Sequence, residues 1–281
     1  MSLRIKILIG LLLGLLFSLI FLESNEPEEI NWFESYAQKD KIPYGTQVLF
    51  NTLKESREGY FNEVFRPPFE FLADSTDLAH GTYFFLNSYI AFDEDEAHNL
   101  LKWVSKGNTL YVGAKGIGET ILDTLGLDTE ALYQLDILEN KPVLQLTNDR
   151  FFDGQSYYLD VEVNSSNYFD EIDTLQTIVL GEYDLAKGDD TLKVKEPNVH
   201  FIKQQFGEGT IVLHLMPDVF TNYFILKEKH HTYTQNALQY IPKDEPIYWD
   251  NHYKNGKTVY TSPLYIFFRN RYLKWAIICL F

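Results

Sequence analysis

The chain has 281 residues, of which 40 are acidic and 24 are basic, so its formal net charge is −16. Nucleic acids and anionic lipid surfaces bind to basic faces of proteins, so we expect no nucleic acid partner. The single cysteine, Cys279, lies in an apolar stretch at the end of the chain. This position excludes a disulfide, a thiol nucleophile and a thiolate metal site from the domain that precedes it.

An apolar run of 18 residues, Ile5–Leu22, stands near the start of the chain. A run of this length is typical of a helix in a bilayer, where every backbone amide must bond within its own segment. Arg4 and Lys6 stand at its start and four glutamates follow within residues 23–30. Because positive residues stay in the cytoplasm, we expect residues 1–22 to form a cytoplasmic tip and a transmembrane helix. The localisation expected is a bacterial inner or plasma membrane, with the main domain extracytoplasmic.

A cleaved signal peptide is the alternative for this run. Its apolar region is usually about 7–15 residues long and ends at small residues. Here the run is longer and closes on Phe21-Leu22-Glu23-Ser24, so we favour an uncleaved anchor. Residues 23–40, which are acidic and polar, then form a juxtamembrane spacer.

Residues 41–262 carry the pattern of a single α/β domain. Helical spacing of apolar residues, capping signals and buried-strand composition predict an alternation of elements in the first half: a helix within Tyr44–Arg57, a strand at Gly81–Ser88, a helix at Asp93–Lys106, a strand at Asn108–Ala114 and a helix at Ile117–Leu125. Such alternation with short connections indicates a parallel or mixed sheet with helices on both faces.

The second half is richer in strands and loops. Strand candidates are Val143–Leu146, Tyr157–Val163 and Thr177–Tyr183. Val199–Met216 reads as a hairpin that turns at Gly207-Glu208-Gly209, and Asp218–Tyr240 as one or two helices.

The end of the chain is again apolar. Trp275–Phe281 is far shorter than the ~20 residues of a spanning helix, so residues 263–281 are expected to be the start of a second, truncated transmembrane helix. The bilayer is then the partner of both terminal segments. Arg269, Arg271 and Lys274 would lie outside, against the positive-inside trend, and a cytoplasmic position of the domain stays open.

Two motifs could hold a ligand. Gly113-Ala-Lys115-Gly116-Ile-Gly118 could cradle a phosphate, but its order matches neither the dinucleotide fingerprint nor the P-loop. We interpret it as a strand-to-helix turn. The acidic run Asp93–Glu96 lacks the central glycine of a calcium loop, and we interpret it as a helix cap.

The histidines stand at positions 80, 98, 200, 214, 230, 231 and 252. In the predicted hairpin His200 and His214 become diagonal neighbours on one face of the sheet. A zinc pair is conceivable, yet no third ligand is evident, and paired core histidines are favoured. His230 and His231 point apart on a helix. Gly154-Gln-Ser156 lacks the second glycine of a nucleophile elbow. We therefore assign no catalytic, cofactor-binding or metal residue and expect no cofactor.

Several stretches together resemble an uncharacterised bacterial family of membrane-anchored domains of unknown function with a class I glutamine amidotransferase-like fold. They cover nearly the whole chain, and the most specific are the first and the last: Trp32, Tyr36 and Lys41-Ile-Pro-Tyr-Gly45; Gly81–Ala114; Phe206–His214 with Pro217, Phe220 and Thr221-Asn-Tyr223; Trp249-Asp250; Ser262-Pro-Leu264; and Tyr272–Ala276.

The resemblance implies an amidotransferase-like (flavodoxin-like) domain flanked by transmembrane helices. It also implies a role in an envelope assembly, because such proteins tend to be encoded beside MoxR-type ATPases. True amidotransferases use a cysteine at a tight turn after a strand, and this chain has none there.

The leading hypothesis is accordingly a membrane-anchored extracytoplasmic domain without evident catalytic activity, which binds a partner or ligand in a cell-envelope assembly. The alternatives are an envelope hydrolase that uses unidentified carboxylates and a solute-sensing domain. By analogy with other open sheets, a binding site is expected at the turns after Ser88 and Ala114.

Overall fold

The computed structural model describes residues 2–24, 30–73, 78–133, 140–151, 155, 157–159, 165–187, 190–192 and 198–254. The chain divides into two compact units, residues 1–31 and residues 32–281. The predicted second transmembrane segment, 263–281, lies outside the described residues, as do Gly154 and Ser156.

The first unit contains helix α1 (Leu3–Ser24), which has 22 residues. Its described apolar side chains are exposed, among them Leu8, Leu11 and Phe17 at 70–78%. Across the residues that the structure describes, no helix has both the length and the apolar character needed to cross a membrane.

The second unit is built around a mixed sheet, which has 10 strands within the described residues and the order β1-β12-β2-β3-β11-β10-β8-β5-β6, with β9 paired to β8. The parallel part consists of β1 (Phe61–Val64), β12 (Ile247–Asp250), β2 (Thr82–Ile90), β3 (Thr109–Ile117) and β11 (Gly209–His214). The antiparallel part consists of β10 (Asn198–Phe206), β8 (Thr177–Lys187), β5 (Asn140–Leu146), β6 (Tyr157–Tyr158) and β9 (Asp190–Leu192). A second small sheet pairs β4 (Asp128–Tyr133) with β7 (Ser165–Glu171).

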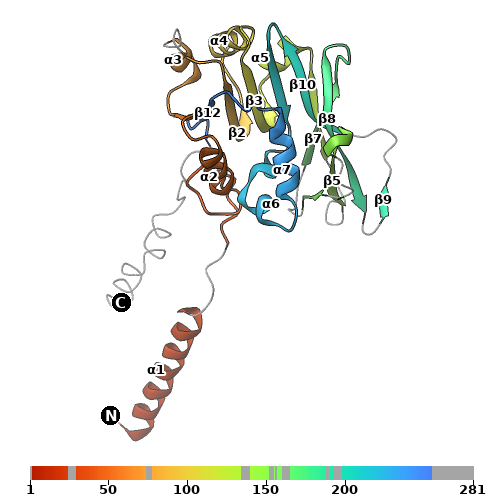
Figure 1. The fold of residues 1–281 in the computed structure, drawn as a ribbon. Coiled ribbons are helices and arrows are strands. Elements are labelled where there is room, and N and C mark those ends of the chain that lie inside the picture. The colour runs from red at the N-terminus through yellow and green to blue at the C-terminus, as the bar shows by residue number, and fades with distance from the viewer. Residues whose placement is uncertain are drawn as a thin grey trace. The chain divides into compact units, whose positions relative to one another are not determined.

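Helices cover both faces of the sheet (Figure 1). One face carries α2 (Gln47–Ser56), α6 (Asn222–Leu226), α7 (His231–Ala237) and the 3₁₀ turns η4 (Pro217–Phe220) and η5 (Leu238–Tyr240). The other carries α3 (Pro68–Ala73), α4 (Glu94–Val104) and α5 (Glu119–Leu125). A further 3₁₀ turn, η3 (Asp149–Phe151), follows β5. The predicted α/β class with a mixed sheet is confirmed.

Successive side chains of the central strands point to opposite faces of the sheet, so the core has one part on each face. On β2, Phe84 and Leu86 face α2 and α7, whereas Tyr83 and Phe85 face α4. All four side chains are fully buried, which explains why this strand reads as a continuous apolar run.

Local signals placed the start of α4 and the turn of the hairpin β10–β11 correctly. The Asp93 carboxylate accepts a hydrogen bond of 2.7 Å from the backbone N–H of Glu96 and so caps α4. The hairpin turns at Gly207, whose φ of 60° suits glycine.

The predicted turn at Gly113–Gly118 is wrong, because β3 continues to Ile117. The glycines there serve close packing between strands. A Cβ at Gly113 would lie 2.5 Å from Leu86 Cδ2, and one at Gly116 would lie 2.7 Å from Tyr89 Cδ2. Gly118 then stands at the N-terminus of α5.

Candidate functional site

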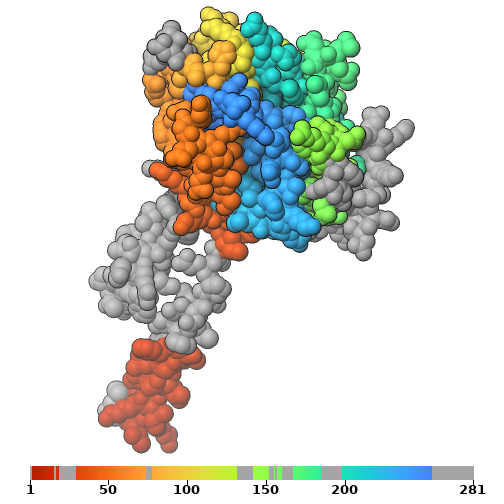
Figure 2. All heavy atoms as spheres, viewed as in Figure 1, coloured from red at the N-terminus to blue at the C-terminus, as the bar shows by residue number. Residues whose placement is uncertain are grey.

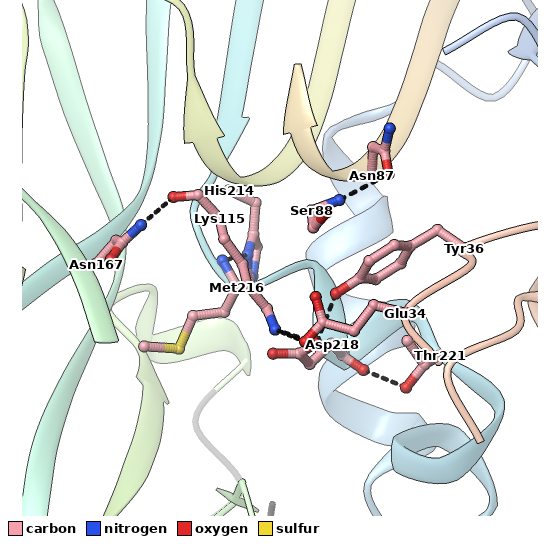
Figure 3. A network of polar contacts seen from close by, with 10 residues as sticks. All are labelled: Glu34, Tyr36, Asn87, Ser88, Lys115, Asn167, His214, Met216, Asp218 and Thr221. Carbon is pink, nitrogen blue, oxygen red and sulfur yellow. Dashed lines mark hydrogen bonds and ion pairs between the residues drawn. The ribbon is translucent and has the colours of Figure 1, made fainter. Parts of the chain in front are cut away.

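Polar side chains gather where the parallel strands β2, β3 and β11 end (Figure 3). Lys115 lies near the end of β3, and Asp218 follows β11 in the turn η4. Glu34 and Tyr36 reach the same place from the segment that precedes α2. We refer to these four residues as the edge cluster. It occupies the edge at which open α/β sheets usually bind ligands.

The edge cluster is joined by short contacts. Lys115 Nζ lies 2.5 Å from Glu34 Oε1 and 3.4 Å from Asp218 Oδ1. The hydroxyl of Tyr36 donates a hydrogen bond of 2.7 Å to the same Asp218 oxygen. Lys115 Nζ also lies 5.6 Å from the centre of the Tyr44 ring, within cation–π range. The carbonyl of Lys115 accepts a hydrogen bond from the side-chain amide of Asn167 on β7.

Burial and charge act in opposite directions on Lys115. Burial favours the neutral amine, but the carboxylates of Asp218 and Glu34 outweigh it and raise the pKa of Lys115. Burial first, and then the charges of Asp218 and Glu34, raise the pKa of the Tyr36 hydroxyl well above its usual value. The amine therefore stays a cation and the phenol stays a proton donor. In these states neither group is a nucleophile or a general base at neutral pH.

The segment that supplies Glu34 and Tyr36 belongs to the second unit, which begins at Trp32. Tyr36 is fully buried and has a φ of 45°, a strained value for a tyrosine. Its N–H donates to the Tyr44 carbonyl (2.9 Å), and its own carbonyl accepts from the Thr46 hydroxyl (3.0 Å). The expected spacer of residues 23–40 is thus structured from Trp32 onward.

The loop between Tyr36 and α2 is held in place by Asn222, which lies far along the chain. The Asn222 amide donates to the carbonyls of Asp40 (2.8 Å) and Ile42 (2.9 Å), and its oxygen accepts from the Val48 N–H (2.9 Å). Gly45 leaves room for the turn, since a Cβ there would lie 2.1 Å from the Asp40 carbonyl oxygen. The run Lys41–Gly45 and the run Thr221–Tyr223 are therefore the two halves of one contact.

Two further charged residues, Asp250 and Lys254, lie near the ends of β12 and β2 and act on each other electrostatically. Lys254 Nζ donates to the Leu86 carbonyl (3.0 Å), and the Asp250 carboxylate accepts from the backbone N–H groups of His252 (3.2 Å) and Tyr253 (2.9 Å). Burial raises the pKa of Asp250 to about 6, although Lys254 opposes this, and burial lowers the pKa of Lys254 to about 8 against the charge of Asp250. Both shifts reflect incomplete solvation at the sheet edge.

His200 and His214 lie together in the core, as the hairpin predicted. Their ring centres are 5.0 Å apart, and Nε2 of each lies near the Tyr233 hydroxyl, at 2.8 and 3.2 Å. Nδ1 of His214 accepts from the Met216 N–H (3.1 Å). His214 must therefore donate through Nε2 to Tyr233, whose hydroxyl then donates to His200. A chain of this kind needs two neutral rings.

Burial enforces that neutrality. It lowers the pKa of His200 to about 3 and, together with the neighbouring His200, lowers that of His214 well below its usual value. Nδ1 of His200 has no hydrogen-bond partner among the described residues. No group of three metal-ligating side chains occurs in the described part of the chain. Both rings are fully buried, so the pair lies in the core of the domain.

The other histidines do not join either cluster. His98, His231 and His252 are exposed, and His230 packs against the Phe224 ring at 4.6 Å. His80 lies beside Gly107 after α4.

The binding site was expected at the turns after Ser88 and Ala114. The residue directly after Ala114 is Lys115, and the structure places it in the edge cluster. Asn87 and Ser88 lie at the same edge (Figure 3), but β2 continues past them to Ile90. Sequence reasoning missed Asp218 and Glu34. Asp218 had a usable signal, because it follows a buried strand, where site residues of parallel sheets collect. Glu34 had no such signal, because it is one of several glutamates in the acidic segment that follows the apolar run.

Comparison with known proteins places the chain in a family whose function is not known. The family model described as "Domain of unknown function (DUF4350)" matches residues 38–238. No curated protein matches the chain.

Solved structures match part of the chain with low identity. The β-galactosidase from Bacillus circulans sp. alkalophilus is 15% identical with a TM-score of 0.34, over 57% of this chain and 22% of that one. The mmIFT52 N-terminal domain is 11% identical with a TM-score of 0.39, over 56% and 76%. The exo-β-1,4-mannosidase Op5Man5 from Opitutaceae bacterium strain TAV5 is 12% identical with a TM-score of 0.32, over 56% and 26%.

The chain spans about a fifth of the length of the β-galactosidases that it matches, and TM-scores this low do not define the fold further. The family model, in contrast, covers well over half of the chain, from Gln38 to Leu238, the residue after the end of α7. The chain belongs to the family described as a domain of unknown function, DUF4350.

Proposed function

We propose that this protein is a membrane-anchored domain that binds a partner or ligand in a bacterial cell-envelope assembly and performs no chemistry of its own. One observation carries the proposal. The carboxyl edge of the parallel strands, where open sheets usually place their active residues, holds a cluster whose lysine is a cation paired with the carboxylates of Glu34 and Asp218. That cluster ties down the protein's own segment instead of presenting an activated group.

The anchor is supported by the apolar run Ile5–Leu22 and by the 22-residue length of α1. A helix of that length spans about 33 Å, close to the ~30 Å of a bilayer core. No helix among the described residues has the length and apolar character of a membrane span, so the proposal rests on the composition of the run and of its flanks in the sequence. With Arg4 and Lys6 at its start, the positive-inside trend would place the main domain outside the cytoplasm.

An amidotransferase-like version of the fold is part of the proposal. It is supported by the five parallel strands covered on both faces and by the resemblance of the stretches around Lys41–Gly45 and Phe206–His214. Glutamine hydrolysis is not included, because the only cysteine of the sequence is Cys279, far along the chain from β2 and β3. Among partners, the resemblance favours an assembly with a MoxR-type ATPase system.

The anchor is tested by extracting membranes with alkaline carbonate. We expect the protein to stay in the pellet and the double variant Leu12→Arg/Leu13→Arg to move to the supernatant, since each arginine costs about 2.5–3.5 kcal/mol at the centre of a span. Alkaline phosphatase fused after Thr46 should be active if the domain is exported. Extraction of the wild-type protein by carbonate would refute the anchor.

Partner binding is tested by photo-crosslinking in intact cells. A benzoylphenylalanine in place of Tyr89, which is 60% exposed near the end of β2, should give discrete adducts. The same group in place of Leu175, which is 94% exposed before β8, is the control. The absence of adducts from Tyr89 and from other exposed positions along the carboxyl edge, or equally strong adducts from Leu175, would count against a binding role of this edge.

A further inference from the structure

A groove lies between α2 and α7, on the face of the sheet turned toward the viewer in Figures 1 and 2, where α2 is orange and α7 is blue. Its volume is about 620 Å³, within the range of roughly 300–1,000 Å³ that is typical of sites for small organic molecules. We call it the α2–α7 groove. It lies apart from the edge cluster, since none of the four cluster residues lines it.

The floor of the groove is apolar. Leu49 and Leu53 of α2 are buried in the core beneath it. Val48, Ile225 and Leu238 are only partly buried and so present apolar surface to the groove. Exposed apolar surface inside a concavity is a common mark of a ligand site.

The charge of the lining differs from that of the chain. The sequence has 40 acidic against 24 basic residues, yet the described residues that line the groove include Arg57, Lys243 and His231 and no aspartate or glutamate. The charged side chains that line the groove are therefore basic, although Asp244 and Glu245 lie close enough to Arg57 to act on its charge. A basic lining favours an anion over a cation.

Arg57 is held in a fixed position. It follows the last residue of α2, and its Nη1 donates to the carbonyls of Pro242 (2.6 Å), Glu245 (3.3 Å) and Lys243. The side-chain hydrogen bonds described for Arg57 all come from Nη1, whereas a guanidinium carries five N–H donors in a rigid fork. Burial lowers the pKa of Arg57, and the carboxylates of Asp244 and Glu245 oppose this shift.

The polar and apolar parts are separated along α2. Val48 stands near the start of the helix and Arg57 directly after its end, which puts about 13 Å of helix axis between them at 1.5 Å per residue. A ligand that contacts both must therefore be elongated, with a charged head and an apolar tail.

We propose that the α2–α7 groove binds an anionic amphiphile, with its carboxylate or phosphate head at Arg57 and Lys243 and its medium-length chain along Val48, Leu238 and Ile225. A free fatty acid and a lysophospholipid share this chemistry. The inference goes beyond the proposed function and depends neither on the anchor nor on the edge cluster.

Photoaffinity labelling of the full chain in phosphatidylcholine vesicles tests the site. The probes are diazirine-bearing dodecanoate, the corresponding lauroyl lysophosphatidate and the neutral monoglyceride. We expect the two anionic probes to label peptides that contain α2 and residues 225–243, and an excess of unlabelled laurate to compete. Stronger labelling by the carboxylate or by the phosphate identifies the source, and both outcomes support the proposal.

Variants separate the groove from general lipid contact. Lys243→Gln removes an exposed charge without touching the core and should weaken anionic labelling by about tenfold, as the loss of a charge-assisted contact does. Lys229→Gln makes the same change of charge outside the lining and should leave labelling unchanged. Leu238→Gln should weaken labelling by all probes. Equal labelling by the neutral probe, or labelling that Lys243→Gln does not reduce, would overturn the proposal.

Discussion

Lys115 shows how one residue can stabilise a sheet edge. Its amine is only partly exposed and is shared by Glu34 and Asp218, and Asp218 also accepts the Tyr36 hydroxyl. The Asp218 side chain is 8% exposed, so its carboxylate depends on these partners for compensation. Removing one partner of a buried pair leaves an uncompensated charge, which costs more than the pair contributes.

Replacing Lys115 with methionine should therefore lower the free energy of unfolding by about 1–3 kcal/mol, measured by urea titration with tryptophan fluorescence. The control is Lys54→Met. Lys54 forms a comparable pair with Glu63 at 3.2 Å, but its side chain is 54% exposed. The loss there should stay below about 1 kcal/mol. Equal losses in the two variants would contradict the buried character of the edge cluster.

The pair His200 and His214 predicts how stability depends on pH. Both are neutral in the folded protein, where the pKa of His200 is about 3, whereas an unfolded histidine titrates near 6.5. Above pH ~6.5 neither state binds the proton and the pair has no effect. Below it, the unfolded state gains protons that the folded state refuses, so stability falls by up to about 1.4 kcal/mol per pH unit for each ring.

His200→Gln should reduce this slope between pH ~6.5 and ~5, whatever its effect on absolute stability. His231→Gln, at an exposed position, should leave the slope unchanged. Asp250, whose folded pKa is raised to about 6, acts in the opposite direction between pH ~4 and ~6. The comparison is therefore made between variants by urea titration at each pH. An unchanged slope in His200→Gln would show that this ring is accessible to protons.

At the scale of elements, the start of α2 depends on a residue far along the chain. Thr46 makes no side-chain capping bond to α2. The Asn222 oxygen accepts from the N–H of Val48 instead, while its amide binds the preceding turn at Asp40 and Ile42. One side chain thus satisfies a helix N-terminus and the loop that leads into it, in the role that a local cap usually has.

Asn222→Ala should lower the free energy of unfolding by about 2–4 kcal/mol, because three hydrogen bonds are lost together and the carbonyls of Asp40 and Ile42 lose their partner. The expected order of opening is the Lys41–Gly45 turn first, which hydrogen exchange can follow at the Val48 amide. Asn236→Ala, on the partly exposed side of α7, should change stability by about 0.5 kcal/mol or less. A cost at Asn222 as small as this would argue that the turn is held by other contacts.

For the whole molecule, the position of the domain boundary matters most. The sequence suggested that the domain begins at Lys41, but the second unit begins at Trp32. The intervening residues bring Tyr36 into the core and Glu34 to Lys115. The main domain therefore includes the segment that directly follows the first unit.

Two shortened chains test this boundary. A chain that begins at Ile30 should unfold cooperatively, whereas one that begins at Lys41 should be less stable by roughly 3–5 kcal/mol, since it loses a fully buried tyrosine and the edge cluster. Urea titration of both chains measures the difference. Tyr36→Ala in the longer chain should reproduce most of the loss. Equal stability of the two chains would show that residues 30–40 are dispensable.

The sequence by itself determined the features that depend on interactions between residues close together in the chain. The capping carboxylate of Asp93, the glycine turn at Gly207 and the apolar runs of β2 and β3 act on neighbours within a few residues, so the helices, the hairpin and the α/β class could be predicted. Only the tertiary structure decided that the four-residue strand β12 inserts between β1 and β2, because so short a run carries no period of its own. It also decided the edge cluster, in which Lys115 and Glu34 are 81 residues apart. Charged residues are too numerous in this chain for their composition to reveal which of them meet.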